Sequence, residues 1–113
     1  MTGSARRFII RRQKSSVAQE RSVARDVGGR RVAGSGSLPG NKGDVREGGW
    51  LIECKQTVTH RFSLTLGLWR KIYGEAVRSD RRPAMVIELS GRRVVVLDYD
   101  DFLAMRSVLD ASA

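Results

Sequence analysis

Three residues near the middle of this 113-residue chain have types and spacing that suit binding of a divalent metal ion. Asp44 is followed by Glu53 after eight intervening residues, and Lys55 comes two residues after Glu53. Carboxylate oxygens are ligands that Mg²⁺ and Mn²⁺ prefer. A lysine has only N–H donors, so it does not compete for the metal. These residue types therefore indicate a candidate metal site.

Two predicted strands would bring the three side chains together. Residues 42–46 and 50–57 have strand-like composition, and the turn between them contains two glycines, which is typical of a hairpin. Residues two apart on a strand share a face, so Glu53 and Lys55 should point the same way. If the two strands pair as a hairpin, Asp44 can lie across from them on the same face.

A third carboxylate, Glu20, lies on a predicted helix over residues 16–27. The apolar residues of this helix form a stripe at helical spacing, and Glu20 falls on it. Burying a lone carboxylate is costly, so we expect a compensating partner. The three carboxylates would together form an oxygen-rich site of the kind that Mg²⁺ or Mn²⁺ prefers. The backbone carbonyl of Cys54 is a candidate further ligand.

Each of these residues also has a structural interpretation. Glu53 and Lys55 could form an ordinary salt bridge on an edge strand, and Asp44 could be a turn residue. Glu20 could be a helix-face charge that reaches solvent past small neighbours. Taken one at a time, the structural roles are favoured. Taken together, three acids and a lysine at positions that the predicted elements can unite favour a metal site.

The rest of the chain predicts one mixed sheet covered by helices. The further elements are a strand at 30–33, a helix at 65–80, strands at 84–89 and 93–98, and a helix at 102–109. Asp100 or Asp101 is the expected cap of the last helix. The order α-β-β-β-α-β-β-α predicts an α/β domain with a mixed, α+β-like sheet over residues 16–113. Residues 1–15 are expected to be a basic, flexible arm.

The charge distribution points to a polyanionic partner. The chain has 21 Lys and Arg against 12 Asp and Glu, which gives a net charge of +9. Residues 1–47 hold eleven of the basic residues and four of the acids, so a DNA backbone would be met mainly there. The candidate DNA contacts are basic residues of this half and two serines of its glycine-rich segment, namely Arg21, Arg25, Arg30, Arg31, Lys42, Ser35 and Ser37.

Composition also excludes several kinds of protein and site. His60 is the only histidine and Cys54 the only cysteine, which excludes a His-based nuclease and a zinc site built from Cys and His. No apolar run approaches the roughly 18 to 20 residues of a membrane span, and the charged first residues lack the apolar segment of a secretory signal. We therefore expect a cytoplasmic protein that has no membrane partner.

Asp44 followed by Glu53-x-Lys55 resembles the signature of the PD-(D/E)XK nucleases. With the glycine- and serine-rich segment ahead of Asp44, and Glu20 on a helix before it, the chain most resembles the archaeal-type Holliday junction resolvases and their phage relatives. The match covers roughly residues 16–57. One departure is Gly43, which stands where the family name has proline.

The resemblance implies a restriction-endonuclease-like core and a homodimer that cuts four-way DNA junctions. It implies that Glu20, Asp44 and Glu53 bind Mg²⁺, two ions per active site, with Mn²⁺ as a substitute. Lys55 would orient or help to deprotonate the attacking water, and Arg31 would contact the DNA backbone. If a phage encodes the protein, its location would be the host cytoplasm.

Two other functions stay open at this point. One is a different PD-(D/E)XK activity, such as a nicking or restriction-like nuclease. The other belongs to a different class: a noncatalytic protein whose basic half coats the phosphates of a nucleic acid and whose acids are structural. The resolvase and the other PD-(D/E)XK activities require a divalent metal. The noncatalytic protein predicts only a steep salt dependence of binding.

Overall fold

The protein is represented by a computed structural model, which describes residues 17–32 and 44–112. The predicted arm at 1–15, the glycine-rich segment at 34–40 and the start of the predicted strand at 42–46 lie outside the described residues. The candidate DNA contacts Ser35, Ser37 and Lys42 also lie outside the described residues.

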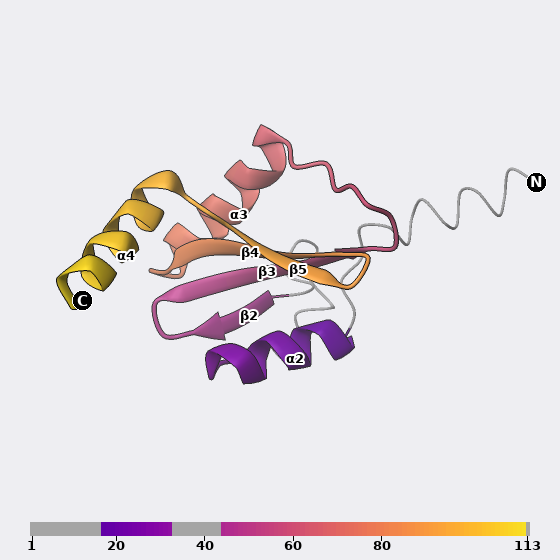
Figure 1. Cartoon of the computed structure of the whole chain (residues 1–113), viewed down its shortest axis with the longest axis horizontal. Helices are drawn as coiled ribbons and strands as arrows, with labels where there is room; N and C mark the ends of the chain where they lie inside the picture. Colours follow the sequence, from indigo (N-terminus) through magenta and orange to yellow (C-terminus); the bar gives the residue numbers. More distant parts are fainter. Residues whose placement is uncertain (1–16, 33–43, 113) are drawn as a thin grey trace, which may run out of the picture.

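The described residues form three helices and a five-stranded sheet (Figure 1). Along the chain the elements are α2 (Val17–Val27), β1 (Arg30–Arg31), β2 (Asp44–Glu47), β3 (Trp50–Thr57), α3 (Leu66–Arg78), β4 (Arg82–Leu89), β5 (Arg92–Leu97) and α4 (Tyr99–Ser112). This is the order that the sequence predicts. The mixed α/β class is confirmed.

The five strands lie in the sheet in the order in which they occur in the chain. Neighbouring strands are antiparallel except β3 and β4, which run parallel. Parallel neighbours require a crossover connection, and α3 supplies it. The β2–β3 hairpin, by contrast, needs only the short glycine-containing turn that the sequence predicts.

The two faces of the sheet are covered by different helices, with α2 along one face and α3 along the other (Figure 1). Val23 and Ala24 of α2 pack into a buried cluster with Val45, Ile52 and Cys54. Because side chains alternate along a strand, the intervening residues point to the opposite face. There Ile72 of α3 packs with Met85 and Ile87 of β4.

The end of α2 is set by two glycines. Gly28 has a φ of +71°, a left-handed conformation that glycine adopts without the steric cost of a Cβ atom. A Cβ atom at Gly29 would collide with the backbone oxygen of Arg46. The second glycine therefore allows the chain that follows α2 to approach β2 closely.

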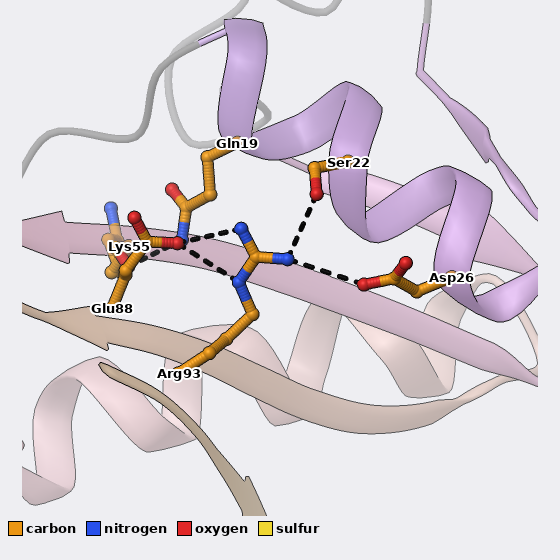
Figure 2. A network of polar contacts seen from close by, with 6 residues as sticks. All are labelled: Gln19, Ser22, Asp26, Lys55, Glu88 and Arg93. Carbon is orange, nitrogen blue, oxygen red and sulfur yellow. Dashed lines mark hydrogen bonds and ion pairs between the residues drawn. The ribbon is translucent and has the colours of Figure 1, made fainter. Parts of the chain in front are cut away.

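A network of polar contacts around Arg93 of β5 also holds α2 on the sheet (Figure 2). Its guanidinium group donates to Oε1 of Glu88 at 2.7 Å, to Oγ of Ser22 at 3.0 Å and to Oδ2 of Asp26 at 3.3 Å. Ser22 and Asp26 are one helical turn apart on α2, so one planar side chain can reach both. The helix is thus tied to both the second and the fifth strands.

The last helix is longer than the sequence predicts and begins at Tyr99. The prediction of Asp100 or Asp101 as its cap is wrong, because both residues lie in its first turn. Asp98 comes before the helix instead, and its Oδ1 accepts from the backbone N–H of Asp100 at 3.1 Å. The start of α4 is held to β4 by an ion pair of 3.0 Å between Arg82 and Asp101.

Among the described residues, none of the helices combines the length and the apolar character that a membrane crossing requires.

Candidate active site

The pair of carboxylates at the centre of the site is set by the β2–β3 hairpin. Asp44 lies directly opposite Glu53 in the register of the two strands, which confirms the predicted placement. Their neighbours Val45 and Ile52 face α2, so the two acids face α3. Both are buried, with 3% of Asp44 and 6% of Glu53 exposed. Two acidic side chains therefore lie inside the layer between the sheet and α3.

The third carboxylate of the site is Glu75 on α3. Asp44, Glu53 and Glu75 each offer one oxygen, and these three oxygens lie within 4.8 Å of one another. Glu75 reaches this position because Ile72 and Ala76, which share its face of the helix, are buried against the sheet. Three carboxylates thus converge, but the third is Glu75 of α3, where the sequence analysis expects Glu20.

The three acids strongly disfavour each other's charged forms. Two unit charges 4.8 Å apart repel by about 3.5 kcal/mol at an effective dielectric constant of roughly 20. Burial, with Glu53 beside it, raises the pKa of Asp44 from 3.8 to about 10. The pKa of Glu75 is also raised, first by burial and then by Glu53. The cluster therefore needs a bound proton or a cation at neutral pH.

The chemistry of this cluster fits a divalent cation. Oδ1 of Asp44 is buried and accepts no hydrogen bond from the described residues, which is costly for a buried acceptor. A cation would satisfy this oxygen and offset the repulsion among the three carboxylates. Hard oxygen ligands of this kind suit Mg²⁺ or Mn²⁺. Asp44, Glu53 and Glu75 are thus the residues that could hold such an ion.

Lys55 lies beside the cluster, as its position on the strand predicts. Its Nζ is 3.2 Å from Oε1 of Glu53, and about a quarter of its side chain is exposed. The backbone at this point is held by α2, because Nε2 of Gln19 donates to the carbonyl oxygen of Lys55 at 2.7 Å (Figure 2). A partly exposed ammonium is therefore positioned at the rim of a buried acidic group.

Glu20 lies apart from the three acids. It is buried on α2, the helix that covers the opposite face of the sheet, and its Oε1 accepts from Nε of Arg31 at 2.9 Å. The compensating partner that the sequence analysis expects thus includes an arginine. The role of Glu20 as a metal ligand, which the resemblance implies, stays a prediction.

Cys54 points away from the acids into the apolar cluster under α2. Its side chain is fully buried, and burial raises the pKa of its thiol to about 12. The thiol is therefore protonated at neutral pH and unsuited to act as a nucleophile or a metal ligand. The role of the Cys54 backbone carbonyl as a metal ligand stays a prediction.

The described candidates for DNA contact divide into two groups. Arg21, Arg25 and Arg30 are exposed and take part in no ion pair among the described residues. Arg31 is half-buried, and its ion pair with Glu20 uses one edge of its guanidinium group. Exposed arginines without acidic partners are available to phosphate groups.

Two residues that belong to the site were missed from the sequence. Glu75 lies three residues after the buried Ile72, at the edge of the apolar stripe of its helix, whereas Glu20 lies in the middle of its stripe. The sequence signal for Glu75 is therefore weaker. Gln19, which holds the Lys55 backbone, carries no signal of its own, because a buried amide at a helix start is common in structural roles.

Comparison of the chain with models of protein families, with curated proteins and with solved structures found no match.

Proposed function

We propose that this protein is a metal-dependent endonuclease of the PD-(D/E)XK type, built on a restriction-endonuclease-like core, that acts on branched DNA. The observation that carries the proposal is the buried cluster of Asp44, Glu53 and Glu75 with Lys55 at its rim. The mutual repulsion of three acids packed together opposes folding unless a proton or a cation offsets it. A divalent cation would also satisfy the buried Oδ1 of Asp44, which accepts no hydrogen bond from the described residues.

The chemistry at this site would be hydrolysis of a phosphodiester. A divalent cation at the cluster supplies positive charge for the phosphate oxygens and lowers the pKa of water. Asp44, Glu53 and Glu75 would hold it, and by the resemblance Glu20 would also contribute to metal binding. Lys55, with three N–H donors, would orient the attacking water or donate to the phosphate oxygens in the transition state.

The charge of the chain supports a nucleic acid as the substrate. The net charge is +9, and the acids of the candidate site are a small negative group within a basic protein. Positive surfaces attract polyanions and raise their rate of association. The basic residues would therefore bring DNA to the protein, and the acidic cluster would act on one of its phosphates.

The preference for a four-way junction and the homodimer are the finer parts of the proposal. None of the residues of α4 is buried, and its apolar side chains stay exposed, including Phe102, Val108 and Leu109. Apolar surfaces of this kind often mark interaction sites. We assign this one to a second copy of the chain, since symmetric incision of a junction requires two sites related by a two-fold axis. Sedimentation of the protein should then show a dimer that Leu109→Lys dissociates.

The test of the proposed activity is a cleavage assay with two substrates, with and without Mg²⁺. The protein should cut a labelled four-way junction in Mg²⁺ at low salt, cut linear duplex much less, and cut nothing in EDTA. Equal rates on the junction and the duplex would remove the junction preference and leave another nuclease of this type, such as a nicking or restriction-like enzyme. If neither substrate is cleaved in a metal-dependent way, the proposed endonuclease activity is refuted.

A second candidate function is supported by the exposed arginines. A noncatalytic nucleic-acid-binding protein would need only these basic residues and would bind DNA with a steep salt dependence. It gives no reason for the buried acids, so we rank it below the nuclease. The two functions separate in the same assay, because the noncatalytic protein would bind the junction in Mg²⁺ and leave it intact.

A further inference from the structure

A cavity of about 350 Å³ opens at the edge of the sheet formed by β1 and β2. Among the described residues, six line it, of which four are arginines and none is acidic: Arg30, Arg31, Val32, Arg46, Gly48 and Arg81. A concave site with so many guanidinium groups is suited to an anion with several oxygens, such as a phosphate. We call this site the arginine cavity.

Three of these arginines lack an acidic partner among the described residues. Arg31 is paired with Glu20, whereas Arg30, Arg46 and Arg81 take part in no ion pair there. Like charges that line one cavity repel each other, which favours binding of an anion. The arginine cavity thus holds three uncompensated positive charges.

Arg81 is held in place by contacts that leave it able to bind. Its Nε donates to the carbonyl oxygen of Gly48 at 3.1 Å, and its Nη1 donates to the carbonyl oxygen of Ser79 at 3.1 Å. A guanidinium group has five N–H donors, so three remain for a ligand. An arginine fixed in this way loses less conformational entropy on binding.

Two of the arginines that line the cavity, Arg30 and Arg46, lie on the same face of the sheet as the acidic cluster, whereas Arg31 points to the face under α2. Arg46 comes two residues after Asp44 on β2, so the two side chains share a face and lie roughly 6.6 Å apart along the strand. Arg30 is the direct partner of Arg46 in the register of β1 and β2. Arg30 and Arg46 therefore flank the candidate active site.

We propose that the arginine cavity binds a DNA backbone phosphate that neighbours the phosphate at the acidic cluster. Within the part of the chain that the structure describes, the lining has one apolar side chain, Val32, and no aromatic ring, so its guanidinium groups dominate recognition. Recognition there would depend on the phosphate group, which free phosphate and nucleic acid share. The choice of DNA rests on the proposed function, in which a polynucleotide lies across the adjacent acids.

The test measures DNA binding in EDTA, where no metal-dependent cleavage occurs. Fluorescence anisotropy would compare the wild-type protein with Arg30→Gln/Arg46→Gln and with a control of equal charge, Arg61→Gln/Arg92→Gln. Arg61 and Arg92 are exposed, lie outside the cavity and form no ion pair among the described residues. Since all four residues are replaced by glutamine, general charge loss is matched, and circular dichroism would check that each variant folds.

We expect the cavity variant to bind DNA roughly tenfold or more weakly, because hydrogen bonds between charged groups are lost. The slope of log affinity against log salt should fall by about 0.9 for one lost phosphate contact on duplex DNA. The control should stay within about threefold of the wild-type protein, since it removes only long-range attraction. Equal losses in the two variants would overturn the proposal.

A second arm distinguishes DNA from free phosphate. A single uncharged methylphosphonate next to the cleavage position should weaken binding to the wild-type protein and have little effect on the cavity variant, because both changes remove the same contact. Inorganic phosphate that binds the cavity as tightly as DNA does, by calorimetry, would overturn the choice of DNA.

Failure of this inference can be told apart from failure of the nuclease. Metal-dependent cleavage with no difference between the cavity variant and its control would leave the nuclease and remove the phosphate site. A selective loss of DNA binding without cleavage under any condition would leave the phosphate site and remove the nuclease.

Discussion

Replacing Asp44 by asparagine should make the metal-free protein more stable at neutral and alkaline pH. Asparagine has the shape of a protonated aspartic acid but cannot become a carboxylate. In the wild-type protein, burial and the adjacent Glu53 raise the pKa of Asp44 from 3.8 to about 10. Over a pH range in which the unfolded chain has lost this proton, the folded protein therefore keeps the group protonated or is destabilised by its charge.

The sign and size of the effect follow from this difference. Because the folded state binds more protons than the unfolded state between pH 3.8 and about 10, stability falls as the pH rises through that window. The slope is at most about 1.4 kcal/mol per pH unit for one proton. Two of the carboxylates, 4.8 Å apart, repel each other by about 3.5 kcal/mol. This value is a second estimate of the stability that Asp44→Asn gains over the wild-type protein at high pH.

The assay is urea unfolding in EDTA at pH 5, 6.5 and 8. Asp44→Asn should be modestly more stable than the wild-type protein already at pH 5, just above the lower end of the window at pH 3.8, and its advantage should grow toward pH 8. Asp110→Asn is the matched control, because Asp110 is exposed on α4 and its ion pair with Arg106 is long, at 3.9 Å. It should keep the wild-type dependence on pH.

Adding Mg²⁺ should shrink the advantage of the variant at pH 8. A cation at 100 times its dissociation constant stabilises the folded protein by about 2.7 kcal/mol, and the asparagine variant should lose most of this gain. The electrostatic account of the cluster is refuted if the free energy of unfolding of Asp44→Asn depends on pH as that of the wild-type protein does. It is also refuted if the substitution destabilises the metal-free protein at pH 8.

Three further outcomes are expected from other parts of the structure. Lys55→Ala should lower the rate of junction cleavage by about 10² to 10⁴ while DNA binding stays within a few-fold, and full activity would exclude Lys55 from the reaction. Arg93→Ala should destabilise the protein by roughly 1 kcal/mol in thermal unfolding, since it removes partly exposed contacts between α2 and the sheet, and an unchanged midpoint would contradict that role. The Cys54 thiol, whose pKa is about 12, should resist alkylation at pH 8 until urea unfolds the protein, so rapid labelling of the folded protein would contradict its burial.

The parts of the fold that could be predicted depend on local sequence pattern. Alternation along residues 50–57 placed Glu53 and Lys55 on one face, and the structure confirms this with a salt bridge of 3.2 Å. The glycine-containing turn set the hairpin register that puts Asp44 opposite Glu53. These contacts lie between residues close in the chain, where period and turn chemistry determine geometry.

The parts that could not be predicted depend on how distant elements pack. An acid on an apolar helix stripe signals burial, but the stripe does not reveal which face of the sheet its helix will cover. Glu20 lies on the helix over one face, and Glu75 lies on the helix over the face that carries Asp44. The arginine cavity likewise joins β1 and β2 to the residue before β4, which the sequence does not bring together.

Calorimetric titration with Mn²⁺ tests the central claim most directly, since the claim is that the three acids form a divalent-cation site. The account predicts binding to the wild-type protein and to Asp110→Asn, and loss of that binding in Asp44→Asn and Glu75→Gln. Glu20→Gln should bind Mn²⁺ more tightly than Glu75→Gln does, because Glu20 lies outside the cluster. Absence of Mn²⁺ binding to the wild-type protein, or equal binding to all variants, would contradict the account.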